Sequence, residues 1–419
     1  MNASIDAAPW LHEAGLARLL EVLNADGEEA RIAGGAVRDA LLGRIVSDVD
    51  IATTNLPAET SRRAAKAGFK TVPTGIEHGT ITVITDGKSV EVTTLRADVE
   101  PDGRRAKVVF GRDWKGDAER RDFTINALYA GADGAVIDLV GGLADLEARR
   151  LRFIGDAEQR IREDYLRILR FFRFFAWFGA GRPDAEGLKA CARLKEGLDG
   201  LSAERIWSEL KKLMNAPDPS RALLWMRQAG VLSRVLPESE KWGIDAIHGL
   251  TVTERDLAWA PDAILRIEAI VPPDEVRMVE LARRLKLSKQ EAARLAGWAA
   301  VPAASAGTSD AALRKQLYLG APQATIDRLK LALAGARSKA GTDDDALMQA
   351  AGFSRQLKVA EGWKAPKFPI KGADIGGMGI PEGPGIGRVL QKLEKMWIDS
   401  GFAMTRSVLL EHAAKLIKS

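Results

Sequence analysis

Residues 34–51 read GGAVRDALLGRIVSDVDI, and this stretch decides the fold of the first part of the chain. Residues 31–33 just before it, Arg-Ile-Ala, predict a short strand, and the spacing of apolar residues after the glycine pair predicts a brief helix through Leu42. A second strand is expected around Asp50. Because alternate residues of a strand share a face, Asp48 and Asp50 would point together while the apolar residues beside them face the core. This order of elements predicts a mixed α/β domain.

The paired carboxylates of Asp48 and Asp50 predict a metal site. Two carboxylates side by side repel each other unless a cation lies between them. Oxygen ligands favour Mg²⁺, which completes its shell with water and substrate phosphates. Gly35 would let the backbone approach a phosphate closely, and Arg38 would add a charge-assisted contact to the same triphosphate. Taken singly, each residue has a simpler explanation as a turn, a strand edge or a surface arginine, but the combination is far more specific.

Glu91 begins a further run, EVTT, with the composition of a strand. A third carboxylate aimed at the metals would deprotonate an attacking hydroxyl or complete a two-metal clamp. A glutamate at a strand edge is the alternative, and the residues themselves leave both open.

Residues 120–128, RRDFTINAL, form a second block of polar residues. Here Asp122 is expected to accept hydrogen bonds from the free N–H groups of a helix start. Asn126 would hydrogen-bond a ribose hydroxyl, and Arg121 would reach a phosphate. Without the domain around it, the block would be interpreted as an ordinary helix cap with surface arginines.

Residues 162–173, REDYLRILRFFR, form a third block. Asp164, Arg167, Arg170 and Arg173 recur every three residues, so on one helix they would form a slowly drifting stripe beside a stripe of leucine and phenylalanine. A solvated charged face is the usual explanation for such a stripe. The aromatic surroundings favour partial burial instead, which isolated arginines do not tolerate without a ligand or partner.

The rest of the chain changes character near residue 151. Before it, runs rich in Val, Ile and Thr predict strands at residues 80–85 and 90–95. After it, apolar residues at spacings of three and four predict helices almost throughout. Proline- or glycine-rich segments separate these helices at residues 217–219, 272–273, 302–307 and 372–387.

Composition limits the class of protein. The 419 residues are 46% apolar and 28% charged, which excludes a disordered chain and a fibrous repeat. The longest apolar stretch, residues 171–179, is interrupted by Arg173 and is too short to span a bilayer. We recognise no signal peptide, and Cys191 is the only cysteine, so no disulfide framework is possible. We therefore expect a soluble, cytoplasmic protein without a membrane partner.

Together, the three blocks resemble the class II tRNA nucleotidyltransferase family, which includes the bacterial CCA-adding enzymes and poly(A) polymerase relatives. Residues 34–50 match the family's GG-x-V-R-D…D-x-D motif, and residues 120–127 match its R-R-D-F-T-x-N-A motif. Further segments are similar to the family's hinge, nucleotide-selecting, neck and tail motifs: residues 141–146, 163–167, 202–206, 372–375 and 383–387. The stretch from about 215 to 360 is weakly informative.

The resemblance implies an α+β protein with a small mixed α/β nucleotidyltransferase head, or palm, followed by an all-α neck, body and tail. The expected divisions are a head at 1–148, a neck with the nucleotide-selecting helix at 149–236, a body at 237–360 and a tail at 361–419. The polar stretch 98–114 would be either a mobile loop that helps to exchange CTP for ATP or an ordinary surface loop.

The resemblance also implies roles for individual residues. Asp48 and Asp50 match the family's metal ligands, and Asp164 with Arg167 match its amino-acid template for the incoming base. Triphosphate or ribose contacts are implied for Gly35, Arg38, Arg121, Arg170 and Arg173.

The template role also follows from the chemistry of the bases. Cytosine and adenine both present an amino group next to an unprotonated ring nitrogen, so a carboxylate can accept from the first while a guanidinium donates to the second. Uracil and guanine present the reverse pattern. One Asp–Arg pair can therefore admit CTP and ATP and reject the other two nucleotides.

We therefore predict Mg²⁺-assisted addition of C, C and A to the 3′ end of tRNA from CTP and ATP, with release of pyrophosphate. The 3′-hydroxyl would attack the α-phosphorus, with Asp48, Asp50 and Glu91 as the catalytic carboxylates. The alternatives are a poly(A) polymerase or an A-adding or CC-adding enzyme of the same family. From another class, the alternative is a non-catalytic RNA-binding protein. The sequence gives no oligomeric state.

Overall fold

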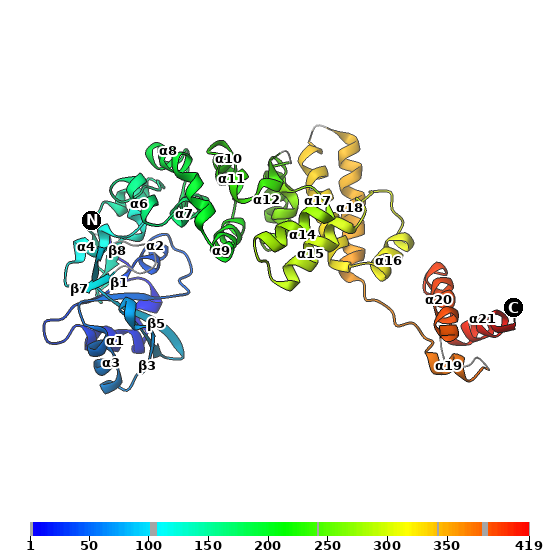
Figure 1. Cartoon of the computed structure of the whole chain (residues 1–419), viewed down its shortest axis with the longest axis horizontal. Helices are drawn as coiled ribbons and strands as arrows, with labels where there is room; N and C mark the ends of the chain where they lie inside the picture. Colours follow the sequence, from blue (N-terminus) through cyan, green and yellow to red (C-terminus); the bar gives the residue numbers. More distant parts are fainter. Residues whose placement is uncertain (1–2, 101–106, 241–242, 342, 379–383, 419) are drawn as a thin grey trace. The chain divides into compact units, whose positions relative to one another are not determined.

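The computed structural model describes residues 3–100, 107–240, 243–341, 343–378 and 384–418. The chain divides into two compact units, Met1–Pro237 and Glu238–Ser419, which we call the amino-terminal and carboxy-terminal units (Figure 1).

A seven-stranded mixed sheet forms the centre of the amino-terminal unit, with the strand order β3-β4-β5-β2-β1-β8-β9. Its strands are β1 (Ala30–Ala33), β2 (Asp50–Thr53), β3 (Lys70–Gly75), β4 (Thr80–Thr85), β5 (Lys88–Thr94), β8 (Leu128–Ala130) and β9 (Val136–Asp138). Strands β2 and β5 run parallel, whereas the other neighbouring pairs are antiparallel. The expected mixed α/β head is therefore confirmed.

The predicted strands agree closely with the observed ones, except that β2 starts later than the site prediction required. Strand β4 has the predicted bounds, and β1 and β5 agree to within two residues at each end. Strand β2 begins only at Asp50. Asp48 therefore precedes the strand, and the prediction that both carboxylates lie on one strand was wrong.

Short helices and a hairpin complete the first half of this unit. The helices are α1 (Ala14–Leu23), α2 (Gly35–Leu41), α3 (Pro57–Lys66), α4 (Trp114–Glu119) and α5 (Gly142–Glu147). Helices α1 and α3 pack against each other and against β4. Strands β6 (Arg96–Glu100) and β7 (Lys107–Phe110) form a separate hairpin. The middle of the predicted 98–114 loop, residues 101–106, lies outside the described residues.

Six helices form the second half of the amino-terminal unit. They are α6 (Ala157–Glu163), α7 (Leu166–Phe178), α8 (Ala185–Leu194), α9 (Ala203–Met214), α10 (Ser220–Gln228) and α11 (Val231–Val235). Helix α7 packs against α9 and α10, and α6 packs against α8. The leucines and phenylalanines of the predicted apolar stripe on α7 are buried.

An aromatic cluster joins α7 to the segment between α4 and β8. The ring of Phe123 lies 4.8 Å from that of Phe153 and 5.4 Å from that of Phe174, measured between centroids. Phe153 stacks on Phe171 at 5.5 Å. Buried aromatic rings contribute large apolar areas, so this cluster fixes the second polar block against the third.

The carboxy-terminal unit is helical throughout its described part. Its helices are α12 (Ala246–Asp256), α13 (Ala263–Ile270), α14 (Glu275–Arg284), α15 (Lys289–Ala300), α16 (Asp310–Leu319), α17 (Pro322–Lys339), α18 (Asp344–Gly362), α19 (Gly372–Gly376), α20 (Pro384–Asp399) and α21 (Arg406–Lys418). One apolar core lies among α16, α17 and α18, and a second among α19, α20 and α21. No helix among the described residues is long and apolar enough to cross a membrane.

The carboxy-terminal unit buries several charged side chains. Arg266 donates to Glu254 through Nε and Nη2, and Arg294 donates to Asp327 in the same way. Glu268 on α13 is 1% exposed, yet neither of its carboxylate oxygens has a hydrogen-bond partner among the described residues. Burial raises the pKa of the Glu268 carboxyl well above its ordinary value, and Asp327 adds to the rise.

We expect the Glu268→Gln variant to be more stable than the wild type near neutral pH. When the pKa of a carboxyl is raised in the folded state, the free energy of unfolding of the protein falls as the pH rises above the ordinary pKa of that carboxyl. Glutamine does not titrate and has no such effect. The gain in the free energy of unfolding should be on the order of 1–3 kcal/mol at pH 7.5 and should vanish near pH 4. Urea unfolding across this range measures it. The exposed Glu280→Gln change on α14 is the control, and an equal gain at both pH values would contradict the expectation.

Candidate active site

A cavity of about 530 Å³ in the amino-terminal unit gathers most of the predicted site residues. Its lining is Gly34, Gly35, Arg38, Asp50, Arg120, Arg121, Asp122, Asn126, Asp164, Leu166, Arg167, Arg170, Phe174 and Arg205. The predicted residues Asp48, Glu91 and Arg173 are not part of this lining. The three blocks, which are far apart in the sequence, therefore meet in one place.

The glycine turn forms one wall of the cavity and requires glycine at its first position. Gly34 has a φ of 69°, in the left-handed region. A Cβ atom there would lie 2.9 Å from Nη1 of Arg121 and 3.3 Å from the carbonyl oxygen of Asn126. The predicted brief helix is present as α2, which begins at the second glycine of the pair, Gly35, and ends at Leu41, one residue earlier than predicted. It carries Arg38, which contacts Asn126 of the second block.

Carboxylates gather at the start of β2. Asp50 pairs in register with Glu91 on the parallel strand β5, so the two side chains share a face of the sheet. The Asp50 residue remains accessible to solvent, but the protein around its carboxyl removes part of its hydration and so raises its pKa. The nearby charges of Glu91 and Asp48 raise this pKa further, while Arg121 opposes them. Asp48 is exposed and accepts a hydrogen bond of 2.8 Å from the hydroxyl of Ser47.

These carboxylates fit a hard divalent cation. Carboxylate oxygens are the ligands that such cations prefer, and the repulsion that raises the pKa of Asp50 is what a bound cation would relieve. Within the described residues, no three His, Cys, Asp or Glu side chains are grouped so as to hold a metal ion by themselves. Asp48 and Asp50 are the carboxylates that would hold such a cation, with water or substrate oxygens completing its shell.

The second block does not form the expected helix start. Residues Thr124–Asn126 form a single 3₁₀ turn, and Asp122 lies two residues before it. Asp122 Oδ1 instead accepts from the backbone N–H of Phe123 at 2.8 Å and from Nδ2 of Asn126 at 3.0 Å. A helix cannot continue from this turn, because β8 begins two residues later at Leu128 and lies in the sheet between β1 and β9.

A chain of polar contacts crosses the cavity from α2 to α7. Nη1 of Arg38 donates to Oδ1 of Asn126 at 2.5 Å, Asn126 donates to Asp122, and Asp122 Oδ2 accepts from Nε of Arg170 at 2.7 Å. Burial opposes ionisation of Asp122, but Arg170 and these hydrogen bonds outweigh it and lower the pKa of the carboxyl. Asp122 and Asn126 thus orient two arginines of the cavity.

The arginine stripe lies on α7, as predicted, and each member has a carboxylate partner. Arg167 pairs with Glu163, Arg170 with Asp122, and Arg173 with Glu209 on α9, each at 2.5 Å. Their side chains are only partly exposed, which confirms the predicted partial burial.

Asp164 does not belong to the same helix as these arginines. It lies in the break between α6 and α7, where its Oδ1 accepts from the backbone N–H of Leu166 at 3.1 Å. Its Oδ2 accepts from Nη2 of Arg205 at 2.7 Å. Because of this break, the Asp164 carboxylate lines the cavity beside Arg167. The expected single helix with a charged residue at every third position is therefore not what places it there.

Sequence reasoning assigned no role to several residues of the site. Arg205 lies in the 202–206 segment that resembles the neck motif, which was the available signal. Phe174 and Phe178 lie beneath the guanidinium of Arg38, at 5.3 and 4.0 Å from their ring centroids. The sequence placed them only in the apolar stretch 171–179. Asp117, which holds Arg121, had no signal in the sequence.

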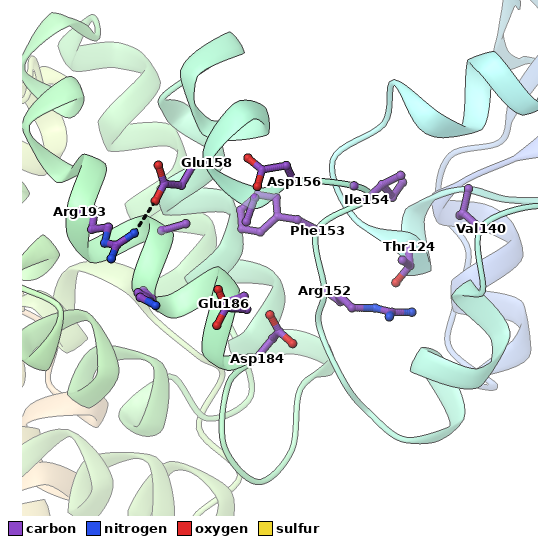
Figure 2. Close-up of a pocket in the computed structure, with 14 residues that line it drawn as sticks. Thr124, Val140, Arg152, Phe153, Ile154, Asp156, Glu158, Asp184, Glu186 and Arg193 are labelled. Carbon is purple, nitrogen blue, oxygen red and sulfur yellow. Dashed lines mark hydrogen bonds and ion pairs between the residues drawn. The ribbon is translucent and has the colours of Figure 1, made fainter.

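A second cavity, of about 600 Å³, lies elsewhere in the same unit (Figure 2). None of the predicted site residues lines it. Three of its four acidic residues have partners: Asp156 and Asp184 cap α6 and α8, and Glu158 accepts from Arg193 at 2.9 Å. Asp50 and the predicted arginines Arg38, Arg121, Arg167 and Arg170 line the first cavity instead.

Two family models match parts of this chain. The model of a poly(A) polymerase head domain matches residues 30–152, and that of a probable RNA and SrmB-binding site of polymerase A matches residues 182–242. The mitochondrial CCA tRNA nucleotidyltransferase 1 of Mus musculus is 36% identical over 409 residues, which cover 96% of this chain and 90% of that protein. The chain belongs to the CCA tRNA nucleotidyltransferase family.

Bacterial members of the CCA tRNA nucleotidyltransferase family are more similar over a shorter stretch. The CCA-adding enzyme of Streptococcus sanguinis is 48% identical over 203 residues, which cover 48% of this chain and 49% of that protein. A crystal structure of the Bacillus stearothermophilus CCA-adding enzyme in complex with CTP matches with a TM-score of 0.73 at 26% identity, covering 96% of this chain and 97% of that one. The resemblance to this family that the motifs gave is confirmed.

We expect the Arg170→Met variant to be less stable, because it leaves the Asp122 carboxylate in the cavity wall without its cation. The loss should be about 1–3 kcal/mol at pH 7. A carboxyl with a lowered pKa in the folded state contributes stability above its ordinary pKa and loses it as the pH falls. The difference from the wild type should therefore shrink below about pH 4. Thermal or urea unfolding measures it. Arg162→Met, which breaks the exposed pair with Glu158, should change stability little.

Proposed function

We propose that this chain adds C, C and A to the 3′ end of tRNA from CTP and ATP, releasing pyrophosphate by metal-assisted nucleotidyl transfer. The observation that carries the proposal is the single cavity that holds Asp50, the arginines of α2 and α7, and the Asp164–Arg167 pair. It offers a place for each part of a nucleoside triphosphate. Membership of the CCA tRNA nucleotidyltransferase family supports the same activity.

The base of the nucleotide would meet Asp164 and Arg167. Arg205 holds one oxygen of Asp164, and Glu163 holds Nη1 of Arg167, so both groups are oriented before a base arrives. Asp164 retains lone pairs for an amino group, and Arg167 retains N–H donors for a ring nitrogen. This polarity suits cytosine and adenine and opposes uracil and guanine, by about 1–3 kcal/mol for each mismatched pairing.

The triphosphate would lie against the arginines. Arg38 and Arg121 each donate to Asn126 and to a carboxylate, and Arg170 donates to Asp122. Because a guanidinium has five N–H donors, each of these arginines retains N–H groups for a phosphate. Gly35 allows the backbone to approach a phosphate closely. We assign Asn126 to the ribose side, where its contacts with Arg38 and Asp122 hold its amide in place. Arg173, which is turned toward Glu209, would act by supporting α7.

The chemical step would occur beside Asp50. We propose Mg²⁺, held by Asp48 and Asp50, as the cation; a bound divalent ion activates the attacking hydroxyl and neutralises charge on the leaving oxygen. The tRNA 3′-oxygen forms a bond to the α-phosphorus while the bond to pyrophosphate breaks. Glu91, in register with Asp50, would accept the proton of the hydroxyl.

The finer organisation and the location of the protein are also proposals. We retain the division into head, neck, body and tail at 1–148, 149–236, 237–360 and 361–419. We also retain a cytoplasmic location, although the Mus musculus relative is named as mitochondrial.

The decisive experiment uses purified protein, Mg²⁺ and a tRNA transcript that ends before CCA. CTP, ATP, UTP and GTP are supplied singly and CTP is then combined with ATP, with products resolved to single nucleotides. We expect two residues from CTP alone and three from CTP with ATP. A long ladder from ATP alone would show a poly(A) polymerase instead, and binding without extension would show a non-catalytic RNA-binding protein.

Removing the charge of Asp50 should abolish nucleotide addition without unfolding the protein. We expect the Asp50→Asn variant to lose at least 100-fold in kcat, since loss of a metal-binding carboxylate removes several kcal/mol of transition-state stabilisation. Its stability should rise slightly, because repulsion from Glu91 is relieved. The control is Asp133→Asn in the turn between β8 and β9, which should keep full activity. Equal activity of both variants would contradict the assignment.

A further inference from the structure

Asp117 on α4 holds two arginines of the cavity at once. Its Oδ1 accepts from Nε and Nη2 of Arg120 at 2.9 and 2.5 Å. Its Oδ2 accepts from Nε and Nη2 of Arg121 at 3.3 and 3.2 Å. Arg120 and Arg121 line the cavity, whereas Asp117 itself does not. The carboxylate therefore contacts two arginines of the cavity without lining the cavity itself.

Tyr129 on β8 fixes the position of that carboxylate. Its hydroxyl donates to Oδ2 of Asp117 at 2.6 Å. Asp117 is 1% exposed and Tyr129 is fully buried, with its ring edge-on to Trp114 at 5.3 Å. A buried tyrosine ring in an apolar core has little freedom, so the hydroxyl cannot move away from the carboxylate.

The pair of arginines balances the charge of Asp117. Burial alone would raise the pKa of the Asp117 carboxyl, but Arg120 and Arg121 outweigh it, and the pKa lies below its ordinary value. The carboxylate therefore stays ionised at neutral pH. Each bond between an ionised carboxylate and a guanidinium is stronger than a neutral hydrogen bond and directional, so both arginine heads have a fixed orientation.

The orientation of Arg121 matters most, because it is packed against the glycine turn. Its Nη1 donates to the carbonyl of Asn126 at 3.2 Å and would lie only 2.9 Å from a Cβ atom added to Gly34. Arg121 is thus held on three sides, by Asp117, Asn126 and the turn. Without Asp117, its long side chain would gain rotamers and lose this position.

We infer that Asp117, fixed by Tyr129, is a positioning residue that orients Arg120 and Arg121 toward the triphosphate of the bound nucleotide. The inference rests on the proposed function. It separates two tasks: Asp117 controls how tightly CTP and ATP bind, while Asp164 and Arg167 control which base is chosen. Asp117 touches neither the base nor the reacting atoms.

The first test is the Asp117→Asn variant, which keeps the size of the side chain and removes its charge. We expect the KM for CTP and for ATP to rise about tenfold or more, with a smaller fall in kcat. The KM for tRNA and the preference for CTP over UTP should stay unchanged. Tyr129→Phe removes only the hydroxyl and should raise the same two KM values about threefold.

The second test asks whether Asp117 acts through the arginines. If it does, adding Asp117→Asn to Arg121→Ala should raise the KM for CTP by less than it does in the wild type, because the contact with Arg121 is already lost and only the contact with Arg120 remains. The control is Asp327→Asn in the carboxy-terminal unit, where an equally buried carboxylate holds Arg294. It should lower thermal stability and leave the KM for CTP unchanged.

The outcomes separate this inference from the proposed function. Unchanged KM values in Asp117→Asn, or full additivity with Arg121→Ala, would overturn the inference while the wild type still adds CCA. If Asp117→Asn does not fold, Tyr129→Phe decides, and unchanged KM values there overturn it. If the wild type adds no nucleotide, the proposed function fails. Equilibrium binding of CTP then tests the inference alone, with weaker binding by the variants supporting it and equal binding overturning it.

Discussion

The site depends on pairing between arginines and carboxylates that come from different parts of the amino-terminal unit. Arg170 of α7 is held by Asp122, Arg173 of the same helix by Glu209 of α9, and Asp164 by Arg205. Half-buried guanidinium groups require such partners, because leaving one unpaired would cost more than the pair gains. Since each pair bridges two elements, the same contacts that satisfy the arginines also set the distance between the walls of the cavity.

An apolar base supports these polar contacts. The phenylalanines of α7 pack against Phe123 and Phe153 on one side, and Phe174 and Phe178 lie under Arg38 on the other. Rings that exclude water lower the local dielectric constant, which strengthens the ion pairs above them. The fold therefore supplies rigidity through the aromatic rings and orientation through the charged groups. A substitution among the aromatic rings is therefore expected to weaken the ion pairs, and loss of an ion pair is expected to loosen the packing of the rings.

Much of the site could be predicted because its residues are grouped into short blocks. The glycine turn, the carboxylate at the start of β2 and the arginine stripe follow from local spacing, and the blocks together indicated the family that the comparisons confirm. Other features could not be predicted. Nothing local shows that Glu91 pairs in register with Asp50, that α6 and α7 break at Asp164, or that Asp117 lies behind Arg121. Strand register and partner choice depend on tertiary packing, which spacing along the chain does not encode.

The pairing of the cavity arginines with carboxylates has a consequence for product release. Every arginine that lines the cavity forms a hydrogen bond or ion pair with a carboxylate, so the cavity presents few bare positive charges to a free anion. When a polyanion leaves such a site, each guanidinium group keeps its hydrogen bond to a carboxylate of the protein. The free energy of dissociation is therefore smaller than it would be for arginines left unpaired. An enzyme that completes a CCA end must discharge pyrophosphate three times for each tRNA. A cavity with unpaired arginines would trap that product and slow every round.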